Sequence, residues 1–146
     1  MKSRPNCPYC QRPLGNESVL AEVCTMTNSI LSVHKHQYHR GRCVLSLKDH
    51  YEELYEVEPE IYLGFMEELK NVCQLISKLF LPDKIQVAFY GDTVRHVHAH
   101  IVPKYTQLED WGFPFLMTSP ADPDESWRET AKTLQEALNG LRLQDL

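Results

Sequence analysis

The stretch His96-Val97-His98-Ala99-His100-Ile101-Val102 alternates histidine with apolar residues. Successive side chains of an extended strand point to opposite faces. Three imidazoles would therefore line one face while Val97, Ala99 and Ile101 bury the other. A helix would scatter the same rings over more than half of its circumference. Imidazole is both a nucleophile and a metal ligand near neutral pH, so the pattern predicts chemistry or coordination.

The length and composition indicate one domain spanning residues 1–146. A chain of this length can bury a genuine core without disulfide staples, and 24% charged and 42% hydrophobic residues are ordinary values. A formal net charge of -5 argues against a nucleic acid or an anionic membrane as partner. No apolar run approaches the roughly 20 residues that span a bilayer, and residues 1–10 contain no signal-peptide hydrophobic region. We therefore expect neither a membrane nor a nucleic-acid partner.

The five cysteines indicate a reducing compartment. Three of them, Cys24, Cys43 and Cys73, lie within apolar segments and are expected to be buried thiols. Free thiols of this kind are typical of proteins kept in a reducing environment. The sequence therefore predicts a cytoplasmic location.

The order of apolar patterns predicts an α+β fold. Short β-branched and apolar runs predict strands at 19–24, 29–35, 43–47, 85–90 and 96–102. Pro59 opens a long amphipathic helix that Leu81-Pro82-Asp83 ends, and its apolar stripe should pack on the sheet. Asp122 as N-cap, Pro123 in the first turn and Glu125 predict a final helix to about residue 141. This order predicts helices packed on an antiparallel sheet.

The spacing of the three histidines favours a division of labour among them. Same-face residues of a strand lie about 6–7 Å apart, too far for three rings to converge easily on one ion. One ring can instead act as a nucleophile while its neighbours orient it, manage protons or stabilise charge. The alternative is a half-exposed strand that merely carries histidines, and the strict alternation disfavours it.

Cys7-Pro8-Tyr9-Cys10 has the spacing of a zinc knuckle, in which two thiolates hold one side of a tetrahedral ion. A redox motif with the same letters needs a preceding strand and a helix that starts at the first cysteine. Here only residues 1–6 precede the motif, and Pro13 and Gly15 follow too closely for a robust helix. Zinc is therefore favoured over redox chemistry, with two inert thiols as the remaining alternative. Distant histidines such as His50 are the natural source of the other ligands.

The remaining polar candidates lie around the triad. Gly91 permits a tight turn, and the Thr93 hydroxyl with nearby amides can donate to a phosphate oxygen, although most Gly-Asp pairs are simply turns. Arg40 and Arg42 are cations that can face a phosphate, and Lys104 fits a surface position equally well. We interpret the histidines of the polar turn as mostly solvated. These are His34, His36 and His39.

At these residues the chain resembles the histidine-triad (HIT) superfamily. The mark of that family is His-φ-His-φ-His-φ-φ, with φ apolar, and residues 96–102 match it at every position. Residues 41–50 are similar to the family's glycine, apolar strand and terminal histidine, and the resemblance covers roughly residues 7–116. It implies a HIT-like half-barrel of antiparallel strands with one long helix, usually a homodimer through a shared sheet. Residues 122–146 extend past this core and are expected to form a packing or dimer helix.

The resemblance also implies an activity. Its members attack the α-phosphate of a nucleoside phosphate derivative, such as a dinucleoside polyphosphate or a nucleoside phosphoramidate. By match to the motif, His98 would be the nucleophile and would pass through a covalent nucleotidyl-histidine. Water or another acceptor would then release the nucleotide. His100 would lie beside the phosphate, and Thr93 stands where members often place a hydroxyl that contacts it.

The zinc-bearing branch of the superfamily uses two cysteines and two histidines. Carried over, these are Cys7, Cys10, His50 and His96. A closed site with four protein ligands is structural and leaves no open position for substrate. His96, although part of the catalytic triad, would hold structural zinc, while the next ring of the triad does the chemistry.

Three positions depart from the common family pattern. Arg42 stands where many members carry histidine and offers a cation for substrate binding. Asp92 stands where glutamine is frequent and adds negative charge near the phosphate. The segment 110–115 resembles a subset of bacterial members, in which we expect it to flank the active site. The first two departures support an alternative function, a non-catalytic zinc-containing protein of the same fold that binds nucleotides or partners.

Overall fold

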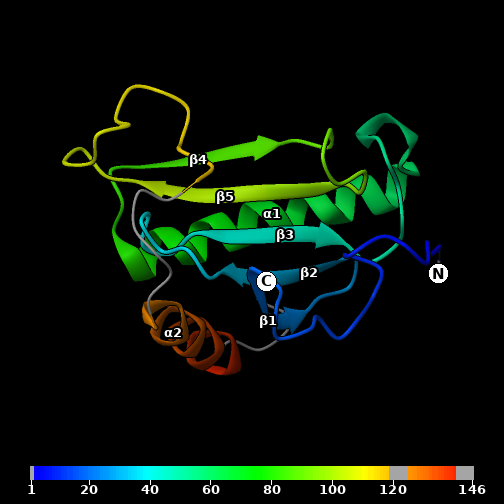
Figure 1. Ribbon diagram of the computed structural model, residues 1–146, viewed down its shortest axis with the longest axis horizontal. Helices are drawn as coiled ribbons and strands as arrows, with labels where there is room; N and C mark the ends of the chain where they lie inside the picture. Colours follow the sequence, from blue (N-terminus) through cyan, green and yellow to red (C-terminus); the bar gives the residue numbers. More distant parts are fainter. Residues whose placement is uncertain (1, 119–124, 141–146) are drawn as a thin grey trace.

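The computed structural model describes residues 2–118 and 125–140 (Figure 1). Within these ranges the strands are β1 (Leu20–Thr25), β2 (Ser29–His34), β3 (Cys43–Leu47), β4 (Lys84–Phe89) and β5 (His98–Lys104). The helices are α1 (Pro59–Phe80), α2 (Ser126–Gly140) and the short 3-10 helix η1 (Leu54–Glu56). The strands form one antiparallel sheet in the order β1-β2-β3-β5-β4. The predicted α+β fold on an antiparallel sheet is confirmed.

One face of the sheet is covered by helices, and α1 runs behind the strands in Figure 1. Pro59 opens α1, and Leu81 ends it in a left-handed conformation with φ 48° whose N–H donates to the Ser77 carbonyl. The buried stripe of α1 and Leu134 of α2 join the same apolar cluster as the inward side chains of the sheet. None of the described helices is long and apolar enough to cross a membrane.

The opposite face of the sheet carries the polar and histidine side chains. In the register of the sheet, Val44 pairs with His100 and Ser46 pairs with His98, while Ala99 and Ile101 point into the helix-covered core. The N-terminal segment packs on this open face, where the knuckle joins a small cluster with two residues of β1 and β3. Its buried members are Cys7, Tyr9, Leu20 and Val44. The alternation predicted for the triad strand therefore separates core from site.

The triad strand itself begins later and ends later than predicted. It starts at His98 rather than His96, because His96 lies in a turn whose N–H donates to the Val94 carbonyl. It continues through Pro103, which the sequence placed after the strand. Pairing with β3 ends at Ile101, and a proline is tolerated where a strand has a single hydrogen-bonded neighbour.

Other boundaries agree to within one residue at the strands, and β3 agrees at both ends. The predicted cap of the last helix at Asp122 and Pro123 lies outside the described residues, and the described part of that helix begins at Ser126. Of the three thiols expected to be buried, Cys43 is fully buried whereas Cys24 and Cys73 are half-buried against the core.

Candidate active site and metal centre

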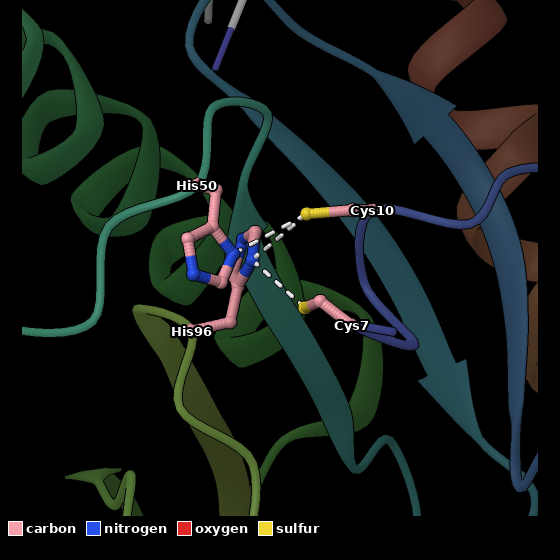
Figure 2. A group of neighbouring side chains, drawn as sticks. All are labelled: Cys7, Cys10, His50 and His96. Atoms are coloured by element: carbon pink, nitrogen blue, oxygen red, sulfur yellow. Dashed lines mark hydrogen bonds between the residues drawn. The ribbon is translucent and has the colours of Figure 1, made fainter. Parts of the chain in front are cut away.

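Cys7, Cys10, His50 and His96 converge beside the start of β5, as Figure 2 shows. One ligand atom from each residue lies within 4.8 Å of all the others. The Cys7 Sγ and His96 Nδ1 atoms are 3.4 Å apart, and Cys10 Sγ lies 3.3 Å from His50 Nδ1 and 3.7 Å from His96 Nδ1. The residues come from segments as far apart in sequence as 7 and 96, which the fold brings together.

These distances fit a tetrahedral zinc ion. Zn–S bonds of about 2.3 Å and Zn–N bonds of about 2.0–2.1 Å place tetrahedral ligand atoms roughly 3.3–3.8 Å apart. The second nitrogen of His96, Nε2, lies 2.8 Å from the Leu47 carbonyl oxygen and must donate to it, which leaves Nδ1 unprotonated for a metal. Because four protein ligands close the coordination sphere, the cluster is a structural zinc site with no position for substrate.

A cavity of about 500 Å³ opens next to this cluster, on the same face of the sheet. His98 and His100 line it with ring centroids 5.2 Å apart. Apolar side chains form much of the remaining wall, and the turn after β4 contributes Asp92 and Thr93. The apolar members are Val19, Leu20, Val44, Val94 and Met117, with the aromatic Tyr9 and Tyr90.

The hydrogen bonding of His98 fixes its tautomer. Its Nδ1 lies 2.5 Å from the His96 carbonyl oxygen, and since a carbonyl only accepts, Nδ1 carries the proton. In the neutral ring Nε2 is therefore the unprotonated nitrogen, with its lone pair available. Burial lowers the pKa of His98, so the ring is neutral at pH 7. A buried neutral imidazole with a free Nε2 is a competent nucleophile.

His100 is also held neutral. Burial first, and then the nearby His98 and Arg42, lower its pKa to about 4. Its ring packs between Tyr90 and Phe115, with centroids 5.5 and 5.8 Å away. The ring therefore offers neutral hydrogen-bonding capacity at the cavity, and no fixed positive charge.

Comparison with known proteins identifies the family. The model of the HIT domain matches residues 20–107, more than half of the chain. The chain belongs to the HIT family. A search of curated proteins finds no match for this HIT protein.

Solved structures of histidine triad proteins share the fold. One from Bradyrhizobium japonicum is 16% identical, with a TM-score of 0.72 over 81% of this chain and 90% of that chain. Another, from Marinobacter aquaeolei VT8, is 20% identical, with a TM-score of 0.72 over 85% and 92%. A Zn-bound histidine triad family protein from Mycobacterium smegmatis is 20% identical, with a TM-score of 0.63 over 85% and 87%. At these identities the similarity establishes the fold alone.

Thr93 and Asp92 of this HIT protein lie in the cavity wall, as their place before the triad predicts. The Thr93 N–H donates to the Asp92 carboxylate at 3.0 Å, so the aspartate caps its own turn and already occupies that amide. The Thr93 hydroxyl stays the candidate phosphate donor of this turn. Neither lysine nor arginine is among the described residues that line the cavity.

Arg42 is not among the residues that line the cavity, although it lies near His34 and His100, which do. It is 2% exposed, its guanidinium lies 5.1 Å from the Phe115 ring centroid, and Nη1 donates to the Met117 carbonyl at 3.3 Å. Burial lowers its pKa to about 10, which still leaves it charged at pH 7. The guanidinium therefore lies against the Phe115 ring and the Met117 carbonyl, and substrate contact by Arg42 stays a prediction.

The prediction that the three histidines of the polar turn are mostly solvated is wrong for two of them, His34 and His39. His34 is buried and lines the cavity, and burial together with Arg42 lowers its pKa to about 3. Its Nδ1 accepts the His36 N–H at 3.1 Å, so the neutral ring carries its proton on Nε2. Strand alternation places His34 on the same face as Val44 of β3 and His100 of β5, but the polar residues around it hide this signal in the sequence.

His39 is fully buried against Asp110, the second error in that turn. Its Nε2 donates to the Asp110 carboxylate at 2.8 Å, and Lys104 Nζ lies 3.0 Å from the same carboxylate. Lys104 was a candidate surface residue, but it is 3% exposed and also donates to the Phe113 carbonyl. Burial raises the pKa of Asp110, but donation from Lys104, the Leu116 N–H and His39 outweighs burial and lowers it.

The buried ion cluster (His39, Lys104 and Asp110) holds the segment 110–117 beside the cavity. The Leu116 N–H donates to the Asp110 carboxylate at 3.1 Å, and the Phe115 N–H donates to Gln86 of β4 at 2.8 Å. Phe115, packed on His100, and Met117 therefore reach the site from this segment. The segment flanks the cavity as the sequence led us to expect.

Proposed function

We propose that this HIT protein is a nucleotide hydrolase or nucleotidyltransferase that acts at the α-phosphate of a nucleoside phosphate derivative through His98. The observation that carries the proposal is the fixed tautomer of His98, whose Nδ1–H donates to the His96 carbonyl and leaves Nε2 unprotonated at the cavity. Burial lowers the pKa of the ring, so the nucleophilic form predominates at neutral pH without a separate base.

The chemistry has two steps. The Nε2 lone pair of His98 forms a bond to the α-phosphorus, and the leaving group departs with the electron pair of its bond to phosphorus. In the second step the oxygen of water or another acceptor attacks phosphorus, and its proton passes through solvent to the departed leaving group. The bond to Nε2 then breaks, which restores the neutral ring. Neighbouring groups, including His100 and the Thr93 hydroxyl, would stabilise the non-bridging oxygens by hydrogen bonding.

The cavity suits a nucleoside beside a phosphate. Its volume of about 500 Å³ falls in the range of small-molecule sites, and apolar side chains face the polar histidine wall. Dinucleoside polyphosphates and nucleoside phosphoramidates are the substrate classes we propose. A homodimer through the sheet, as the family resemblance implies, remains our expectation for the assembly.

Zinc, when bound, supplies structural cross-linking at its four ligands. His96 ties the two parts of the site together, because its Nδ1 faces the cysteines while its own carbonyl accepts the proton-bearing nitrogen of His98. The ligand set therefore orients the backbone atom that holds the nucleophile.

Substitution His98→Ala tests the proposal. We expect loss of nucleoside monophosphate release by at least about a thousandfold, since the residual rate lacks a nucleophile. Zinc content and thermal unfolding midpoint should stay near the wild-type values. Mass spectrometry of acid-sensitive adducts should detect a nucleotidyl group on His98 in the wild-type protein.

The control variant is Tyr55→Ala, because Tyr55 is 84% exposed and outside the cavity wall. Unchanged turnover in the His98 variant would refute the mechanism. Tight nucleotide binding by the wild-type protein without turnover or adduct would instead establish the non-catalytic alternative.

A further inference from the structure

We propose that Tyr9 is a positioning residue that couples the metal centre to His98, a role that rests on the nucleophilic function proposed above. Its ring holds the plane of the His98 imidazole, and the knuckle formed by the two cysteine ligands holds Tyr9. Metal occupancy thereby controls the orientation of the nucleophile through a side chain that ligates no metal and transfers no proton.

The ring of Tyr9 touches both parts of the site. It stacks on His98 with centroids 4.7 Å apart and an interplanar angle of 29°, and it lies against His96 at 5.2 Å and 35°. Tyr9 is 8% exposed, so this arrangement is a packed contact and not a surface coincidence. One side chain therefore bridges a metal ligand and the candidate nucleophile.

The backbone of Tyr9 is set by the knuckle. Tyr9 stands between Cys7 and Cys10, and the N–H groups of Cys10 and Gln11 both donate to the Cys7 carbonyl at 3.0 and 3.1 Å. These bonds join residues within the knuckle. The position of the knuckle over the sheet therefore depends on side chains that contact other segments. The two thiolates that join His50 and His96 are such side chains, and Arg12, which donates to Ser46 of β3 at 2.9 Å, is another.

The hydrogen bond from Nδ1 does not by itself fix the orientation of the His98 ring. The Nδ1–H bond to the His96 carbonyl fixes one edge of the imidazole, but a single hydrogen bond permits the ring to tilt about it. A stacked ring restricts that tilt because it covers one imidazole face. Attack in line with the leaving group requires the Nε2 lone pair to stay aimed at phosphorus, and small misplacements are costly.

Two substitutions of Tyr9 test the role in zinc-loaded protein. Tyr9→Leu removes the stacked ring and should lower kcat by roughly 10–100-fold with KM changed by less than about threefold, because orientation and not binding is lost. Tyr9→Phe keeps the ring and should restore kcat to within about threefold of wild type. A rise in KM with kcat unchanged would show that Tyr9 only contacts substrate, and would overturn the proposal.

The NMR signals of His98 provide a readout that does not need turnover. The ring current of Tyr9 shields the His98 ring protons, so Tyr9→Leu should move these signals downfield in selectively labelled protein, whereas Tyr9→Phe should not. Zinc removal by a chelator should produce the same direction of change in the wild type. In Tyr9→Leu protein the chelator should then change the His98 signals much less.

The outcomes of this comparison separate the coupling from the enzymatic function. Equal chelator effects in wild type and Tyr9→Leu would overturn the proposal, because the metal would then act through the His96 backbone alone. Coupled NMR shifts in a protein that turns over no nucleotide would leave the coupling intact and refute the proposed function. Zinc analysis and amide spectra of each sample establish that the compared proteins are folded and equally loaded.

Discussion

The two ends of strand β5 are held in chemically different ways. At its start, His96 joins Cys7, Cys10 and His50 in a cluster of soft metal ligands. At its end, Lys104 joins Asp110 and His39 in a buried ion cluster without a metal ligand geometry. Each end ties another segment onto the same face of the sheet: the knuckle, which is distant in sequence, at the start, and residues 110–117, which follow the strand closely, at the end.

The metal-ligand cluster and the buried ion cluster act as two anchors, and they differ in what they need to form. The metal end depends on an external ion and on thiolates, whereas the ion cluster depends only on protonation states within the chain. Tyr9 reaches His98 from the first anchor and Phe115 reaches His100 from the second. The rings of His98 and His100 are therefore packed by two different segments, whose anchors can be removed one at a time.

Breaking the metal anchor should have the largest effect. Cys10→Ser should abolish stoichiometric zinc and destabilise the fold by several kcal/mol, because the binding energy of a structural zinc is available only to the folded chain. Zinc analysis and urea unfolding measure the two effects. Cys73→Ser is the matched control, since Cys73 lies on α1 outside the cluster, and it should keep one zinc per chain. Full zinc content in Cys10→Ser protein would contradict the assigned ligand set.

Breaking the ion cluster should come next in size. Asp110→Ala leaves the Lys104 ammonium buried without its carboxylate, and loss of one partner of a buried pair costs about 3–5 kcal/mol. Zinc content should not change, which distinguishes this anchor from the first. Glu129→Ala removes an exposed partner of Arg40 and should cost less than about 0.5 kcal/mol. A loss as small for Asp110→Ala would mean that the cluster does not hold the segment.

The smallest predicted effect concerns pH and lies between the anchors, at His34. Its folded pKa of about 3 is below the unfolded value of about 6.5, so the unfolded chain alone binds a proton as the pH falls below 6.5. The stability contributed by neutral His34 is thus present at pH 7.5 and falls by about 1.4 kcal/mol at pH 5.5. His34→Asn keeps an acceptor for the His36 N–H and should show a correspondingly smaller decrease in urea unfolding. Equal decreases in both proteins would refute the assignment.

The sequence predicts several features of the site in addition to the order of strands and helices. Alternation placed His98 and His100 on one face, and ligand chemistry together with the family resemblance assembled all four zinc ligands. Buried polar residues were harder, because a histidine or lysine in a polar stretch looks solvated until its partner is known. His39 is paired with Asp110, 71 residues away in sequence, and the same carboxylate pairs with Lys104. That partnership depends on tertiary structure, which no local pattern records.

Arg42 and Tyr9 are two further residues whose contacts depend on tertiary structure. The sequence predicts a cation near the phosphate at Arg42, which stays a prediction, but it does not reveal the contacts of Arg42 with Phe115 and Met117. The sequence predicts no role for Tyr9, which stands between the two cysteines of the knuckle, although its ring contacts two of the three triad histidines. A role that depends on the contact between two rings can be recognised only in the three-dimensional structure.

The sequence separation within the metal centre has a consequence for synthesis of the chain. Translation delivers Cys7 and Cys10 first, His50 later and His96 last. A nascent chain therefore exposes at most three of the four ligands until His96 emerges. Because His96 lies two residues before β5, the fourth ligand becomes available just before the strand that carries His98 and His100, so the metal centre can close before that strand is complete.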